Sequence, residues 1–329
     1  VVWVLCLFRP FLGLIDWISQ LLGSQSPYSV AMAIPVSLSL FHTVFNIVNT
    51  FLLVWFIKPI GKIVTKLVPE VYPLEKEIEE PKFLNEKILQ YPETVIASLL
   101  DESKYLYKNA IFEIVAHALN IHRVDIISDL AAKKVVKKSV EDFKTDVRAL
   151  YLHKVKTIYG EIIRYATNAQ SSLKLSEIQN KRIMQIKLAN RIMVEIIRDI
   201  GELNRNVSKY LDSENRFVKQ QYNKFRKSVV KVLRAIHMYR TEKENQQKYH
   251  EKLMALQQEA MENIYKDNLE INELIRDDKI TTDMASSLVN DHDNVNKLIT
   301  KLITVAEILF IAKDPLMNES GEDMPRKVA

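Results

Sequence analysis

Apolar residues follow two different patterns along the chain, and the change comes near residue 58. Residues 31–57 contain no Asp, Glu, Lys or Arg, whereas charged residues are frequent after them. As a helix with a rise of ~1.5 Å per residue, this segment is ~40 Å long and exceeds the ~30 Å of hydrocarbon in a bilayer. It lacks the polar face that a helix in water needs. The pattern therefore predicts a membrane-spanning helix, with a tilt or a break at Pro35 taking up the extra length.

The charges that flank this segment predict its orientation. Lys58, Lys62 and Lys66 recur at a spacing of four residues, so they share one helix face directly after the apolar run. Positive charge next to a spanning helix is retained on the cytoplasmic side. We therefore expect the remainder of the chain to be cytoplasmic.

The residues before the apolar segment predict more membrane-associated structure. Residues 1–8 are apolar from the first position, and the sequence Arg9-Pro10 is expected to end that helix. We expect the chain to be a fragment that begins inside an earlier spanning helix. Residues 11–22 predict an interfacial helix around Trp17, and residues 23–27 predict a turn on the outer side.

Beyond Pro92 the apolar residues recur at a helical spacing, with almost no strand signal. We predict an all-α chain with a membrane part at 1–68, a linker at 69–91, a helical domain at 92–312 and a flexible tail at 313–329. The linker is rich in proline and acidic residues. About six helices are expected, at 92–119, 125–170, 176–210, 214–240, 244–276 and 280–312, and they suggest two successive three-helix units.

Composition excludes several classes of protein. The hydrophobic fraction is 47%, the charged fraction 26% and the net charge +5, spread along the chain. A single cysteine, Cys6, cannot form an internal disulfide. The six glycines form no phosphate-cradling loop, and no nucleophile with a base and an orienting group stands out. We expect no enzyme.

Three sequence motifs carry a family resemblance. Residues 41–46, FHTVFN, followed by FIKP at 56–59, resemble the last membrane helix of the bacterial sodium/phosphate cotransporter family. Residues 192–210, IMVEIIRDIGELNRNVSKY, and 286–291, SSLVND, are similar to the two signature helices of the PhoU-like domain that many bacterial members carry at the C-terminus.

The resemblance implies a multi-pass protein of the bacterial inner membrane that moves phosphate with sodium as the coupling ion. It also implies a cytoplasmic PhoU-like bundle that regulates transport. The family's sodium and phosphate site is built from two glutamine-serine-serine motifs. Here Gln170-Ser171-Ser172 lies in the polar helical part and is discounted, so the core transport residues are expected to precede Val1.

Two carboxylates in the first signature helix are the candidate metal ligands. Glu195 and Asp199 are four residues apart and share a helix face, where like charges repel unless a cation lies between them. The resemblance implies a divalent metal at such a pair, with Asp291 as the counterpart in the second unit. The alternative, which we favour, is a solvated acidic face neutralised by basic residues, namely Arg191, Arg198 and Arg205. Ser287 stands where the second unit would need another carboxylate.

A polar pair inside the predicted spanning helix is the candidate transport site. His42 and Asn46 share one helix face, and a buried imidazole in a membrane is a functional candidate. A hydrogen bond between helices is the simpler explanation, and we favour it.

Lysines and arginines interleave with aromatic residues over 219–240. No nucleic-acid-binding module accompanies them, so we interpret the segment as a packed helix with a solvated basic outer face and expect no nucleic acid.

Two hypotheses for function remain. The first is sodium-driven phosphate transport with a regulatory bundle, in contact with the lipid bilayer and with either a second copy or a cytoplasmic regulatory partner. The second is a membrane-anchored regulatory or scaffold protein that transports nothing.

Overall fold

The computed structural model describes residues 2–67, 78–85 and 91–311, and all regular secondary structure in those residues is helical. The prediction of an all-α chain is confirmed for them. The chain divides into two compact units, Val1–Leu74 and Glu75–Ala329. The predicted tail at 313–329 and the linker positions 69–77 and 86–90 lie outside the described residues.

The first unit is a helical hairpin of α1 (Val2–Leu21) and α2 (Ile34–Leu67), joined through the short 3-10 turn η1 (Ala31–Ala33). The rings of Phe11 and Phe41 meet edge to face at 5.2 Å, and the hydroxyls of Ser19 and Ser37 lie 3.4 Å apart. Later positions of α1 thus meet earlier positions of α2, and the two helices run antiparallel.

The prediction that the first helix ends at Arg9-Pro10 is wrong in position, because the helix is interrupted at Leu7 and then continues through Pro10. The backbone is irregular at Leu7, with φ −112° and ψ 23°, one turn earlier. A proline inside a helix removes one hydrogen bond and presses on the carbonyl of the preceding turn, so it bends the helix there. Pro35 is the second residue of α2, where a missing N–H costs nothing, and it breaks no helix.

The first half of the second unit is built on the long helix α9. It contains α3 (Pro92–Leu106), the π-helical turn η3 (Tyr107–Ile111), α4 (Phe112–Ala118), α8 (Lys156–Ser172) and α9 (Glu177–Leu211). Helices α3, α8 and α9 pack on one another.

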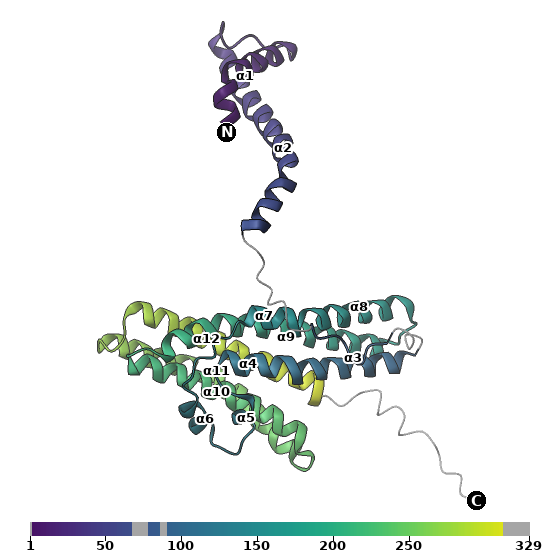
Figure 1. The fold of residues 1–329 in the computed structure, drawn as a ribbon, viewed down its shortest axis with the longest axis vertical. Helices are drawn as coiled ribbons and strands as arrows, with labels where there is room; N and C mark the ends of the chain where they lie inside the picture. The colour runs from purple at the N-terminus through teal and green to yellow at the C-terminus, as the bar shows by residue number, and fades with distance from the viewer. Residues whose placement is uncertain (1, 68–77, 86–90, 312–329) are drawn as a thin grey trace, which may run out of the picture. The chain divides into compact units, whose positions relative to one another are not determined.

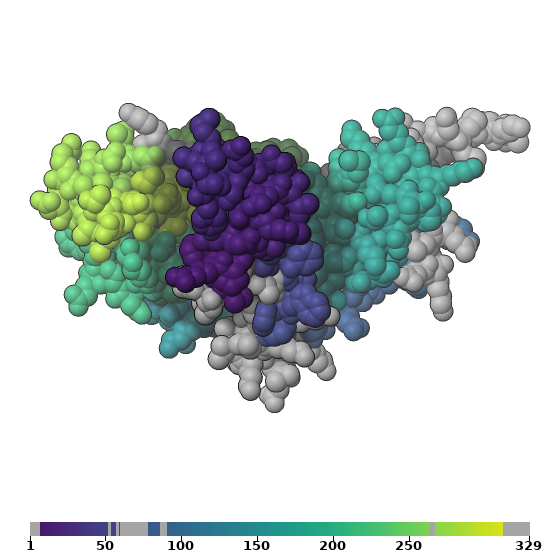
Figure 2. All heavy atoms as spheres, turned by 90° about the horizontal axis from the view of Figure 1, so that it is seen from above, coloured from purple at the N-terminus to yellow at the C-terminus, as the bar shows by residue number. Residues whose placement is uncertain are grey.

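The second half contains α10 (Arg216–Thr241), the 3-10 turn η4 (Lys243–Asn245), α11 (Gln246–Arg276), α12 (Thr282–Ala306) and the π-helical turn η5 (Glu307–Ile311). Helices α10, α11 and α12 each pack on the other two, and α12 also lies along α9. The turn between α8 and α9 (teal) and the turn between α11 and α12 (yellow-green) lie at opposite ends of this unit in both views (Figures 1 and 2).

Local sequence explains where α9 begins and which face it buries. Ser176 and Gln179 form a complete capping box, each side chain accepting a hydrogen bond from the other's backbone N–H. Ile186, Met193 and Ile200 recur at helical spacing and are fully buried. Burial of each such side chain contributes roughly 1.5–3 kcal/mol.

The predicted single helix at 125–170 is wrong. The structure divides this stretch into four helices with an irregular segment at 139–146. The helices are α5 (Arg123–Ile126), α6 (Ala132–Lys138), α7 (Val147–Lys154) and α8.

Hydrogen bonds from distant parts of the chain hold the segment 139–146 out of a helix. The Asn120 side chain accepts the Phe143 N–H at 3.1 Å, and the Ser208 hydroxyl donates to Asp142 at 2.9 Å. Asp146 then caps α7 by accepting the Ala149 N–H at 2.9 Å. Asn120 and Ser208 are distant from this segment in the sequence, and the segment itself contains no proline that would mark a helix break.

Two arginines of α10 attach residues between 119 and 139 to the second half of the unit. Arg226 is 1% exposed and donates to the carbonyls of Leu119, Asn120 and Ser139 at 2.7–3.1 Å. Arg234 donates to the carbonyl of Ile126 at 2.7 Å. The interpretation of α10 as having a solvated basic face is therefore wrong for Arg226, whose pKa burial lowers to about 10.

The described part of the linker, residues 78–85, is hydrogen-bonded to the helices. The fully buried carboxylate of Glu102 accepts the backbone N–H groups of Lys82 and Phe83 at 2.8 and 2.6 Å. Tyr165 donates to the Asn85 carbonyl at 3.0 Å. These residues extend the helical unit upstream of Pro92.

Candidate functional site

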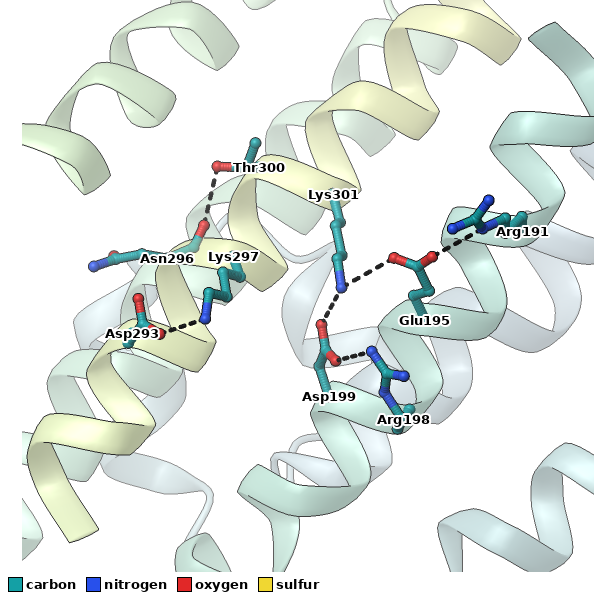
Figure 3. A network of polar contacts seen from close by, with 9 residues as sticks. All are labelled: Arg191, Glu195, Arg198, Asp199, Asp293, Asn296, Lys297, Thr300 and Lys301. Carbon is teal, nitrogen blue, oxygen red and sulfur yellow. Dashed lines mark hydrogen bonds and ion pairs between the residues drawn. The ribbon is translucent and has the colours of Figure 1, made fainter. Parts of the chain in front are cut away.

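The predicted acidic pair lies on α9, facing α12, and holds a lysine. The ammonium of Lys301 is 2.6 Å from an Asp199 oxygen and 3.3 Å from a Glu195 oxygen (Figure 3). All three side chains are mostly buried, with 13–28% of each exposed. Lys301 therefore occupies the position between the two carboxylates in which a cation would relieve their repulsion.

Two predicted arginines complete this cluster from the solvent side. Arg191 bonds Glu195 at 3.2 Å and Arg198 pairs with Asp199 at 3.6 Å (Figure 3). Burial acts to raise the pKa of Glu195, but the hydrogen bonds and charges of Lys301 and Arg191 bring it below its ordinary value.

This arrangement does not fit a divalent-metal site at Glu195 and Asp199, because a metal would have to displace the Lys301 ammonium. Among the residues that the structure describes, no group of three or more His, Cys, Asp or Glu side chains is placed to hold a metal ion. The contacts favour the neutralised acidic face over the metal assignment. Sequence reasoning missed Lys301 because it lies on a helix a hundred positions away; only its place on the polar face of α12 marked it.

Asp291 is not brought to the acidic pair. It lies ten positions before Lys301 on α12, about 15 Å along the helix at ~1.5 Å per residue. It is 3% exposed and accepts hydrogen bonds from the Tyr222 hydroxyl at 2.6 Å and the Asn206 amide at 2.8 Å. Burial raises the pKa of Asp291. Its contacts join α9, α10 and α12, and Ser287, which stands in place of a second carboxylate, lies one turn earlier on α12.

A second buried polar group, not predicted from sequence, follows Asp291. His292 is 5% exposed, lies 3.1 Å from an Asp267 oxygen of α11, and stacks on Phe225 at 5.7 Å. Burial lowers the pKa of His292, although the nearby charge of Asp267 acts in the other direction. A cavity of only ≈ 50 Å³ adjoins the pair, enough for a water-sized guest.

In the first unit, several polar groups of α2 bond to their own helix. Thr43 donates to the Ser39 carbonyl at 3.0 Å and Thr50 to the Asn46 carbonyl at 2.8 Å. The candidate transport residues His42 and Asn46 are both exposed in this unit, and His42 meets the ring of Phe41 edge to face at 6.0 Å.

Among the described residues, one helical segment, Ala31–Phe56, is long and apolar enough to cross a membrane, by length and composition alone. Large apolar side chains on it are exposed, including Ile47 (51%), Phe51 (68%) and Trp55 (81%). Comparison of the chain with models of protein families, with curated proteins and with solved structures gives no match.

Proposed function

We propose that α2 crosses a bacterial inner membrane and that the chain acts in sodium-driven phosphate transport, with the second unit as a cytoplasmic regulatory bundle. The observation that carries the membrane part is the exposure of Ile47, Phe51 and Trp55 on a helix of spanning length. Large apolar side chains exposed to this extent are stable in lipid, whereas in water another part of the protein or a partner would have to cover them.

The assignment to phosphate transport rests on the resemblance of residues 41–46 and 56–59 to the last membrane helix of sodium/phosphate cotransporters. A sodium ion entering down a membrane potential releases about 2.3 kcal/mol per 100 mV, which with a sodium gradient is enough to drive an anion inward. His42 and Asn46 would be the polar contribution of α2 to that pathway.

The packing of the second unit supports a PhoU-like regulatory role. Helices α3, α8 and α9 pack together, as do α10, α11 and α12, which is the arrangement expected of two three-helix units. The signature segments 192–210 and 286–291 lie on α9 and α12, which run along each other.

Flux measurements on cells test this function. Deleting the gene is expected to abolish a sodium-dependent component of radiolabelled phosphate flux, while removing only 92–311 leaves flux that no longer responds to phosphate supply. The matched control replaces sodium by choline in the medium of the parent strain. Unchanged sodium-dependent flux after deletion of the gene would contradict the transport role.

The second candidate is a membrane-anchored regulatory protein without transport, which needs one spanning helix; among the described residues one segment is long and apolar enough to cross a membrane. The carboxylates of the candidate metal site are taken up by Lys301, Arg191 and Arg198, so the cluster acts as a clamp between α9 and α12. This candidate predicts normal phosphate flux in the deletion strain together with altered expression of phosphate-responsive genes.

A further inference from the structure

A groove in the second unit lies beside the acidic pair, on another face of α9. Residues 144–151 form one wall and residues 194–205 of α9 form the other. Its volume is ≈ 840 Å³, and pockets for small organic ligands typically measure about 300–1,000 Å³.

The wall opposite α9 is held in place by specific local structure. Lys144 adopts a left-handed backbone conformation, with φ 48°, and Thr145 donates to the His117 carbonyl at 3.2 Å. Val147 of α7 packs against α9 at Gly201, where even a Cβ would meet it at an ordinary contact distance of 3.4 Å. The groove is therefore part of the folded unit.

The groove carries an excess of positive charge. Its lining includes four cationic side chains, Lys144, Arg148, Arg198 and Arg205, against two carboxylates, Asp146 and Glu202. Arg198 also pairs with Asp199 outside the groove, so the other three cations carry the excess. One Asp146 oxygen is already engaged in capping α7. Arginine guanidinium groups are planar and bind phosphate oxygens through paired hydrogen bonds.

Apolar side chains lie among these charges. Val147, Tyr151, Val194 and Ile197 line the same groove, so a ligand with a ring or another apolar part would bury it there while its anionic part meets the arginines. A surface that only solvates charge needs no such apolar lining.

We propose that this groove is a binding site for a phosphorylated small molecule with an apolar moiety, a nucleotide being the ligand of that chemistry and size. Arg148 and Arg205 bind the phosphates from opposite walls, and the apolar residues contact the base. The chemistry of this site does not depend on whether α2 takes part in transport.

Calorimetric titration of the full chain in detergent, in magnesium-free buffer, tests the site with ATP as the probe. ATP is expected to bind more tightly than tripolyphosphate, which lacks the base, and than adenosine, which lacks the charge. Its affinity should fall as sodium chloride is raised from low to physiological concentration, because salt screens the guanidinium–phosphate attraction.

The variant R148Q/R205Q is expected to lose ATP affinity by roughly tenfold or more, since two charge-assisted contacts are removed. The matched control R164Q/R276Q removes the same charge from exposed positions outside the groove and is expected to bind as the parent does. All four positions are exposed, so the variants should fold, which circular dichroism verifies. The proposal is overturned if ATP does not bind, if adenosine or tripolyphosphate binds as tightly, or if R148Q/R205Q retains the affinity of the control.

Discussion

The long helix of the first unit exposes large apolar side chains, whereas the long helix of the second unit buries them. On α2, Phe51 and Trp55 expose 68% and 81% of their surface, whereas on α9 Ile186 and Ile200 expose none. Both helices are longer than thirty residues, so length does not separate them. They differ in pattern: α9 has one apolar and one charged face, which suits a helix in water, whereas residues 34–57 of α2 carry no charge, which suits a helix in lipid. The hydrophobic pattern of a helix thus indicates how much of its surface is polar, but it does not identify the helices that pack against it.

The largest expected effect comes from placing charge on the exposed face of α2. The variant I47R/F51R should leave the membrane fraction after an alkaline wash, because each arginine near the middle of a bilayer costs about 2.5–3.5 kcal/mol on an insertion scale. On a helix exposed to water the same changes would be nearly neutral. Immunoblots of membrane and soluble fractions provide the measurement. An I47R/F51R protein that stays fully membrane-bound would remove the basis of the comparison.

The orientation of the first unit is tested by cysteine labelling in a Cys6→Ala background. A membrane-impermeant maleimide should label Gln25→Cys in intact cells, because the turn between α1 and α2 is predicted to lie outside. It should label Ser172→Cys, on the exposed end of α8, only after permeabilisation. Labelling of Ser172→Cys in intact cells would mean that the predicted topology is reversed and that the second unit lies outside.

The next largest effect is expected in the core of the second unit. Ile200→Ala should lower the free energy of unfolding by about 2–5 kcal/mol, because it removes a fully buried side chain and leaves a cavity. Leu188→Ala, on the same helix but 47% exposed, is the matched control and should change it by less than about 0.5 kcal/mol. Thermal unfolding followed by circular dichroism measures both. Equal losses would mean that Leu188 is covered in solution.

Hydrophobic periodicity predicted most of the helices that form the core of the second unit, but it did not predict the irregular segment 139–146. The ends of α3–α4, α9, α10 and α11 follow from apolar spacing and from local signals such as Ser176 and the left-handed Asn120 and Asp278. The segment 139–146 could not be predicted, because Asn120 in the turn after α4, Ser208 on α9 and Arg226 on α10 stabilise it. The candidate site shows the same limit: Glu195, Asp199 and two arginines are visible as one helix face, but Lys301 reaches them only through the packing of α12.

The clamp between α9 and α12 is expected to contribute less than the core. Lys301→Met should destabilise the second unit by about 1–2 kcal/mol, between the values for exposed and buried pairs, because it leaves two like charges together. The pKa of Glu195 is lowered in the folded state, so its stabilisation is present above about pH 4.3 and is lost as the pH falls through the lowered pKa. The difference between the parent and Lys301→Met should therefore shrink below about pH 4.

Lys297→Met is the control for this clamp, since Lys297 pairs with Asp293 on the exposed face of the same helix and its removal should matter less (Figure 3). Manganese distinguishes the clamp from the metal hypothesis. The effect of manganese on thermal unfolding should be the same in the parent and in E195A/D199A. A stabilisation that disappears in E195A/D199A would restore these carboxylates as metal ligands.

The smallest expected effect concerns His292, whose burial the hydrophobic pattern of the sequence did not indicate. Burial lowers its pKa in the folded state, so between that pKa and the ordinary value of about 6.5 the unfolded chain binds more protons than the folded one. Stability should consequently fall as the pH drops below about 6.5, and His292→Gln should weaken that dependence. His250→Gln, at a half-buried position of α11, should leave it unchanged, and unfolding temperatures between about pH 5 and 8 make the comparison. A stability that rises on acidification in the parent, but not in His292→Gln, would mean that Asp267 outweighs burial and holds the imidazole charged.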